Sequence, residues 1–89
     1  MKYRILIDGL LSEFSGGEAV LLDLTRKRYH LLNQTAGFIW TALEKAPMTE
    51  EALAEALVAG YGIEPDRARG TAARFTTQLL DMGLIEASK

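Results

Sequence analysis

The sequence contains no cysteine and only one histidine among its 89 residues. Without thiols it can form neither disulfide bonds nor a thiolate zinc site, and it has no cysteine nucleophile. Catalysis by serine with histidine needs a nucleophile, a base and an orienting group held together, and His30 is the sole imidazole. A metal site would need carboxylates around that one ring, and none stands at ligand spacing. The sequence therefore predicts no catalytic residue, no metal and no cofactor, and it argues against an enzyme.

Excess positive charge and long hydrophobic runs are also lacking. Ten basic residues stand against 12 acidic ones, and the net charge of −2 gives no general attraction to nucleic acid or to an anionic membrane. The acidic residues leave open the alternative of a catalytic acid–base pair of carboxylates. Most of them stand at helix starts or on polar faces, where carboxylates are usually solvated. Asp8 interrupts the apolar amino-terminal run after three residues, so we expect no signal peptide and no membrane span. We expect a cytoplasmic protein.

The first third of the chain has short apolar runs that are typical of strands. Runs at 5–7 and 10–14 are separated by Gly9, and after the turn signal at Gly16-Gly17 come runs at 19–22 and 29–32. The last two have hairpin spacing around a charged tip without glycine, so a left-handed residue there would be one such as Lys27. We count three strands, the amino-terminal material followed by the hairpin.

The remainder has helical periodicity, with three helices opened by Asn33, Thr49 and Pro65 and each ended near a proline or a glycine. Their expected apolar faces are Ala36, Ile39, Trp40 and Leu43, then Leu53, Ala56 and Leu57, then Ala68, Ala72, Phe75, Leu79 and Met82. The sequence thus predicts one domain over residues 1–89, an α+β fold in which a three-stranded antiparallel sheet is followed by three α-helices.

Two features could bind a partner chain. In a simple meander the third strand, residues 28–32, lies at an edge, where unpaired main-chain groups can pair with another extended chain. The open alternative is that a helix or the amino-terminal segment covers this edge. The second feature is a row on the third helix, beside its apolar face, formed by Arg67, Thr71, Arg74 and Gln78. Its arginines could bind carboxylates or carbonyls, or the row could be a solvated face.

Over about residues 16–85 the sequence resembles the PqqD-like family. A short aliphatic strand ends in aspartate, and after a turn come tyrosine, leucine-asparagine, threonine and a small residue. The matching residues are Leu21, Leu22, Asp23, Tyr29, Leu32, Asn33, Thr35 and Ala36. The likeness is strongest to the small separate subunits of lasso-peptide biosynthesis that bind the precursor's leader. Lys27 stands where family members commonly have glycine, and His30 stands where they commonly have an aromatic residue. These departures leave the expected fold unchanged and concern only the assignment to a subfamily.

The resemblance implies a winged-helix-like fold and a leader-peptide recognition domain that works with a separate leader protease. The leader would add as an antiparallel strand to the third strand, in a groove against the third helix. The peptide-binding residues that we expect are Arg28, Tyr29, His30, Leu31 and Leu32 on the strand, and Arg67, Thr71, Arg74, Phe75, Gln78 and Met82 on the helix. Which flank of that helix lines the groove is left open.

Two other functions remain as alternatives. The same family includes a peptide chaperone for a radical enzyme of pyrroloquinoline quinone synthesis. Winged-helix DNA binding would place the third helix in the major groove, but Arg69 lies on the far flank from Arg67 and Arg74, and the net charge is negative. We therefore expect a peptide partner rather than nucleic acid or a membrane.

Overall fold

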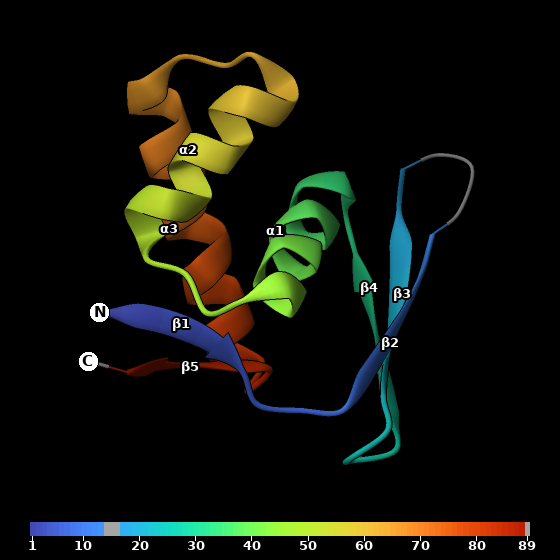
Figure 1. Ribbon diagram of the computed structural model, residues 1–89. Coiled ribbons are helices and arrows are strands. Elements are labelled where there is room, and N and C mark those ends of the chain that lie inside the picture. The colour runs from blue at the N-terminus through green and yellow to red at the C-terminus, as the bar shows by residue number, and fades with distance from the viewer. Residues whose placement is uncertain (14–16, 89) are drawn as a thin grey trace.

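The computed structural model describes residues 1–13 and 17–88. Over these ranges the chain forms two antiparallel sheets and three helices (Figure 1). In chain order the elements are β1 (Lys2–Ile5), β2 (Gly9–Glu13), β3 (Ala19–Asp23), β4 (Arg28–Leu32), α1 (Gln34–Lys45), α2 (Glu50–Tyr61), α3 (Pro65–Asp81) and β5 (Ile85–Ser88). The predicted strand residue Phe14 and the first glycine of the predicted turn, Gly16, lie outside the described residues. The α+β class is confirmed.

The larger sheet has the order β2-β3-β4 and is a meander of two hairpins. At the tip between β3 and β4, Lys27 has a φ of 57°, as its position in a tip without glycine predicts. The buried carboxylate of Asp23 fixes this turn, because its Oδ1 accepts a hydrogen bond of 2.9 Å from the backbone N–H of Arg26. The side chain of Asp23 thus stabilises the turn that follows β3.

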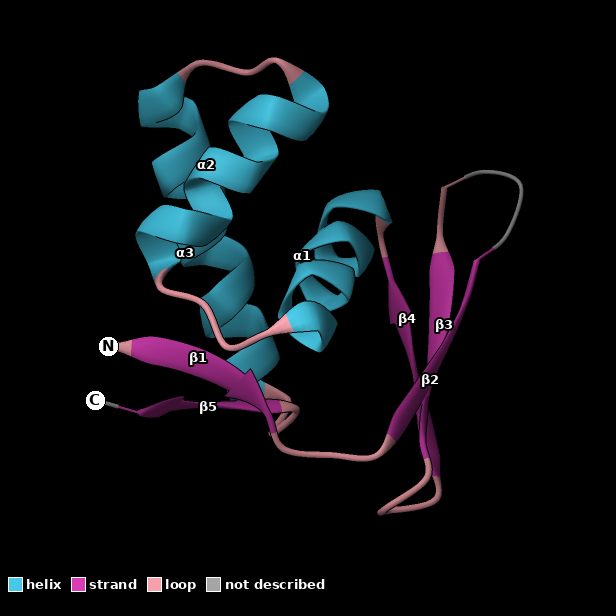
Figure 2. Cartoon of the chain, viewed as in Figure 1, coloured by secondary structure: helices cyan, strands magenta, loops and turns pink. Residues whose placement is uncertain are grey.

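The amino-terminal material is two strands rather than one, which corrects the predicted count. β1 is not part of the larger sheet. It pairs with β5, a carboxy-terminal strand that the sequence did not predict (Figure 2). The chain then turns toward β2 at Gly9, where a Cβ atom would lie 3.0 Å from the ring of Trp40. A side chain at this position would press on Trp40, so glycine favours the close approach of β2 to α1.

The helices begin where their caps predict. The side chain of Asn33 accepts a hydrogen bond from the Ala36 N–H at 2.9 Å, and that of Thr49 accepts one from the Ala52 N–H at 3.0 Å. Gly62 ends α2 in the left-handed conformation with a φ of 67°. Each cap satisfies donors or acceptors that the helix itself leaves free, which sets the ends of the helices.

The core lies between the helices and the inner face of the larger sheet. Trp40 and Phe75 are buried in it, as predicted, together with Leu21 and Leu32 from the sheet. In α2 the buried alanine is Ala54, whereas the predicted Ala56 is only half-buried. None of the helices in the described part of the chain is long and apolar enough to cross a membrane.

Candidate peptide-binding site

The strand β4 lies at the edge of its sheet. Its only strand partner among the described residues is β3, so alternate main-chain N–H and C=O groups of β4 point outward. The amino-terminal segment, which could have covered this edge, pairs with β5 and with Met48 instead. The outer edge of β4 therefore has no strand partner in the described part of the chain, and strand addition requires such an edge.

Side chains alternate along β4, as a strand demands. Tyr29 and Leu31 point to the outer face of the sheet and are 68% and 67% exposed. Leu32 points to the core, and His30 is half-buried on the same inner side. The Nε2 atom of His30 is buried and has no hydrogen-bond partner among the described residues. Thus His30 faces away from Tyr29 and is half-buried rather than freely exposed.

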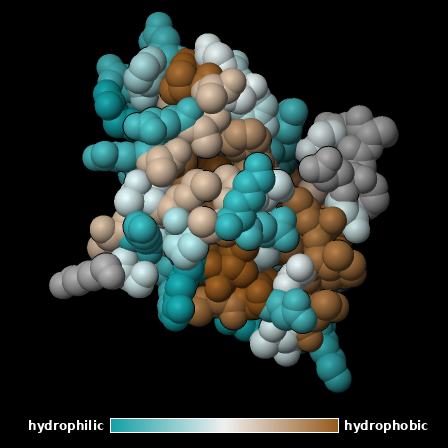
Figure 3. Space-filling model, viewed as in Figure 1, coloured by the Kyte–Doolittle hydropathy of each residue, from teal (hydrophilic) through white to brown (hydrophobic). Residues whose placement is uncertain are grey.

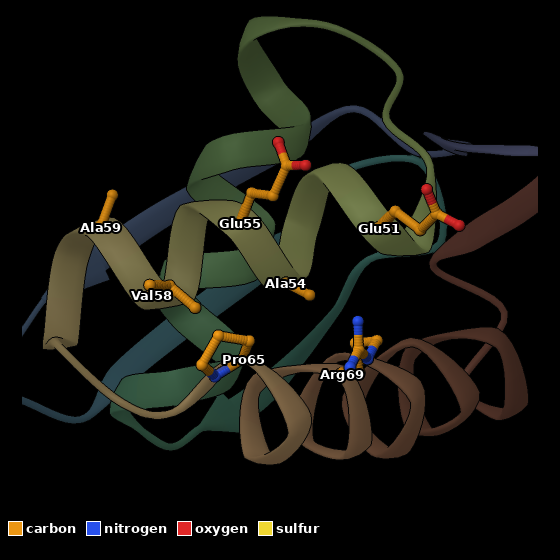
Figure 4. A pocket seen from close by; sticks show the side chains of 7 residues that line it. All are labelled: Glu51, Ala54, Glu55, Val58, Ala59, Pro65 and Arg69. Carbon is orange, nitrogen blue, oxygen red and sulfur yellow. The ribbon is translucent and has the colours of Figure 1, made fainter.

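The two flanks of α3 have different surroundings. Arg69 forms an ion pair with Asp66 and lines a crevice of about 420 Å³ between α2 and α3 (Figure 4). At 100° per residue, the row of Arg67, Arg74 and Gln78 lies on the other flank and so points away from α2. All three are exposed, and Thr71 in the same row is half-buried. The flank of α3 without Arg69 is therefore the one that α2 leaves free.

This free flank of α3 and the edge of β4 lie on either side of α1. The helix α1 packs against both elements, whereas α3 and β4 make few direct contacts with each other. They approach at one end, where a Cβ atom on Gly83, just after α3, would lie 2.8 Å from Arg26 in the β3–β4 tip. The edge of β4 and the free flank of α3 therefore both adjoin α1, with the tip at one end, and we call this surface the candidate groove.

Basic side chains outnumber acidic ones at the candidate groove, where Asp81, seven residues after Arg74, is the acidic residue on the same flank of α3. Arg26, Lys27 and Arg28 are exposed at the strand end, and Arg67 and Arg74 are exposed on α3. The guanidinium of Arg74 also lies 5.4 Å above the ring of Phe75, which is buried. Acidic residues gather instead on α2, at Glu50, Glu51 and Glu55. The groove can therefore attract an acidic segment despite the net charge of −2.

The chemistry of a catalytic or metal site does not emerge from the described residues. They contain no group of three or more histidine, aspartate or glutamate side chains placed to hold a metal ion. The pKa of Tyr3 is raised, first by burial and then by the Glu50 carboxylate, which accepts its hydroxyl hydrogen bond at 3.2 Å. This hydrogen bond joins β1 to α2. The four surface crevices described are lined by residues outside 28–32. What β4 offers is a main-chain edge, not a pocket.

The chain is similar to a known protein family and to solved structures. The family described as coenzyme PQQ synthesis protein D (PqqD) matches residues 18–85. The solved structure of TbiB1 in complex with the TbiA(beta) leader peptide is 23% identical, with a TM-score of 0.75 over 97% of this chain and 98% of that chain. Lasso peptide synthetase B1 complexed with the leader peptide is 25% identical, with a TM-score of 0.71 over 98% of this chain and 100% of that chain. No curated protein matches the chain.

Proposed function

Because the chain belongs to the PqqD family, we propose that it recognises the leader segment of a ribosomally made precursor peptide without catalysing a reaction. The observation that carries the proposal is the open edge of β4 beside the free flank of α3. An extended peptide completes such an edge through main-chain hydrogen bonds, and pockets for alternate side chains select its sequence. Residues 1–89 act in this proposal as one recognition domain of winged-helix-like arrangement.

The binding residues fall into two groups. Main-chain groups of Arg28 to Leu32 pair with the leader, and each net hydrogen bond contributes about 1 kcal/mol. The opposite wall supplies side-chain contacts. It consists of Arg67, Thr71, Arg74, Phe75, Gln78 and Met82. Of these, Phe75 is 7% exposed, so it shapes the wall mainly through its packing under Arg74.

The proposed ligand is the leader of a lasso-peptide precursor. Both structural relatives are leader-peptide complexes, and they match nearly the whole of this chain. A recognition domain raises the local concentration of its peptide at the enzyme that acts on it. We therefore propose that this domain delivers the bound precursor to a separate leader protease.

A second candidate follows from the family itself. PqqD is described as a coenzyme PQQ synthesis protein, and in that setting the same edge would present a peptide to a radical enzyme. Duplex DNA binding through α3 is not supported, because Arg69 lies at the α2 crevice and not beside Arg67 and Arg74. Testing the leader against each type of processing enzyme separates the first two candidates.

Backbone NMR shift mapping tests the proposed site. The probes are the TbiA(beta) leader peptide and the leader of a candidate precursor peptide from the same organism, which we call the cognate leader. We expect the amides of residues 28–32 and those of the free α3 flank to shift on addition of the cognate leader. Shifts concentrated on α2, around residues 53–61, would place the peptide elsewhere and contradict the proposal.

A further inference from the structure

Three buried polar side-chain atoms have no hydrogen-bond partner among the described residues. They are Oδ2 of Asp23, Nε1 of Trp40 and Nε2 of His30. Folded proteins leave few such atoms unsatisfied, because each has lost its hydrogen bonds to water without replacement. The Asp23 oxygen has a cation 4.0 Å away, the Nε of Arg26, and Trp40 is enclosed in the core at 1% exposure. His30 is the one of the three that belongs to the edge strand β4, where a bound peptide can supply the missing partner.

The imidazole of His30 lies at the boundary between the core and the edge of the sheet. Its direct neighbour on β3 is Leu21, which is fully buried. Leu32, two residues further on the same side of β4, is also buried, whereas His30 itself is half-buried. The ring therefore occupies the inner side of β4, next to the place where an added strand would join the sheet.

An antiparallel strand added to β4 places one of its residues directly opposite His30. Directly opposite residues in such a pair point to the same face of the sheet, with their Cβ atoms about 4.5–5.5 Å apart. The leader side chain at this place therefore meets the imidazole. The terminal torsion of a histidine side chain is broad, so a rotation of the ring can turn Nε2 toward the added strand.

The outer side of β4 offers a mainly apolar surface. Tyr29 and Leu31 point outward there, and their neighbours on β3 are Leu22 and Val20. Figure 3 shows apolar side chains gathered over β2 and β3. Leader residues opposite Tyr29 and Leu31 therefore meet mostly hydrocarbon. Selection of one uncharged polar residue in the leader falls to the inner side of the strand, at His30.

We propose that His30 determines the specificity of the peptide edge, because its Nε2 forms a hydrogen bond with one hydroxyl or carboxamide side chain of the leader. This inference rests on the proposed function. A neutral imidazole presents either a donor or an acceptor at Nε2, depending on the tautomer. The side chains of serine, threonine, asparagine and glutamine match both tautomers, since each can donate and accept. An apolar leader residue at this place leaves Nε2 without a partner and binds more weakly.

The antiparallel register also defines the neighbours of this leader residue. The residue two positions before it lies opposite Leu32, and the residue two positions after it lies opposite Arg28. The first adjoins the buried Leu32 and should be apolar, whereas the second lies beside an exposed cation and should be acidic. The leader segment thus has an apolar, a hydrogen-bonding and an acidic residue at alternate positions.

A double-mutant cycle between the domain and the cognate leader tests the proposal. Each hydroxyl or carboxamide residue of the leader is replaced by alanine, and each peptide is titrated against the wild type and against His30→Phe, which keeps a ring without nitrogen. We expect one leader substitution to weaken binding to the wild type about tenfold and binding to His30→Phe less than about twofold. His30→Gln, whose carboxamide can donate and accept, should restore part of this coupling.

The matched control is Tyr29→Phe, which removes a hydroxyl group from the outward side of the same strand. The leader substitution that is coupled to His30 should weaken binding to Tyr29→Phe as much as binding to the wild type. Circular dichroism melting confirms that each variant is folded.

NMR of the imidazole nitrogens gives a second readout that needs no substituted domain. His30 is the only histidine in the chain, so the ring signals of an isotope-labelled sample belong to it. The chemical shift of a ring nitrogen responds to hydrogen bonding. The Nε2 resonance should therefore move when the cognate leader binds, and it should move less when the coupled leader residue is alanine.

Three results would overturn the role of His30. They are leader substitutions that all weaken the wild type and His30→Phe equally, a bound leader segment without a hydroxyl or carboxamide side chain, and a Nε2 resonance that stays unchanged while the amides of residues 28–32 shift. Each of these leaves leader binding by the β4 edge standing. A wild-type domain that does not bind the cognate leader is a different failure, because it contradicts the proposed function itself.

Discussion

The guanidinium of Arg26 lies against Gly83, so closely that a Cβ atom on this glycine would come within 2.8 Å of Nη1. Arg26 belongs to the tip between β3 and β4, and Gly83 follows α3. The contact joins the β3–β4 tip to the turn that follows α3, at one end of the candidate groove. Gly83 has a φ of 73°, a conformation that glycine adopts without strain.

Gly83→Ala should therefore destabilise the protein. The left-handed conformation alone costs a residue with a Cβ atom about 1–2 kcal/mol, and the added methyl group displaces Arg26. Urea unfolding measures the change. Gly70→Ala is the control, because this exposed α3 glycine has open space around its Cβ position, and the substitution should stabilise by about 0.5–1 kcal/mol. Equal stability of the two variants would contradict the role assigned to Gly83.

Leu31→Pro should weaken leader binding more than Leu31→Ala does. Proline removes a main-chain donor and distorts the edge strand, whereas alanine removes only a side chain. Isothermal titration with the cognate leader measures both affinities. A folded Leu31→Pro variant that binds as well as Leu31→Ala would show that the β4 edge does not pair with the peptide.

Arg74→Ala should weaken binding of an acidic leader and make the affinity less sensitive to salt. Arg74 is exposed on the free flank of α3, where a charge contact is screened by added ions. The matched control is Arg69→Ala, on the flank that lines the α2 crevice. If Arg69→Ala has the larger effect on the peptide titration, the groove uses the opposite flank.

Asn33→Ala should lower stability by about 1 kcal/mol without a direct loss of peptide contacts. The Asn33 side chain caps α1 by accepting the Ala36 N–H, and loss of such a cap has this typical cost. Asn33→Asp retains an acceptor and should unfold at nearly the wild-type urea concentration. Its position directly after β4 makes a peptide titration necessary as well, since a loss of affinity in the Asn33→Asp variant would reveal a binding role.

Tyr3→Phe should change the stability of the protein at high pH. The pKa of Tyr3 is raised above its ordinary value of 10.0 by burial and by Glu50, so the folded state favours the protonated hydroxyl. The contribution of Tyr3 is fully present below pH 10.0 and is lost as the pH rises through the higher folded-state pKa. Melting temperatures should be measured from about pH 8 to about pH 11, a range that includes the ordinary tyrosine pKa. As the pH rises, the melting temperature of Tyr3→Phe should fall less steeply than that of the wild type.

The sequence predicts the parts of this fold that local chemistry determines. Asn33 and Thr49 cap their helices through hydrogen bonds to residues three positions away, so the signal is contained in one turn. The pairing of Ile5 with Ile85 is different. Each of these strands has only four residues, too few for a periodic pattern, and neither reveals its distant partner.

For the candidate site, too, the sequence predicts the parts that follow from strand order and from spacing along one helix. The edge position of β4 follows from hairpin order, and the helical spacing of Arg67 and Arg74 follows from 3.6 residues per turn. Which flank of α3 is free could not be read from that spacing, because it depends on where α2 packs. The apolar residues on the solvent-facing side of the β2-β3-β4 sheet were not predicted as one surface, for a related reason. Leu10 and Tyr29 become neighbours only through the register of β3 between them.

The pairing of β1 with β5 has a consequence for how this domain can be combined with others. Lys2 lies opposite Ser88, so the two ends of the described chain leave the molecule side by side, on the far side of α1 from β4 (Figure 1). A short linker could join them, or the whole unit could be inserted into a surface loop of an enzyme. In either arrangement the edge of β4 stays free, so the domain can be joined to another protein without covering this edge.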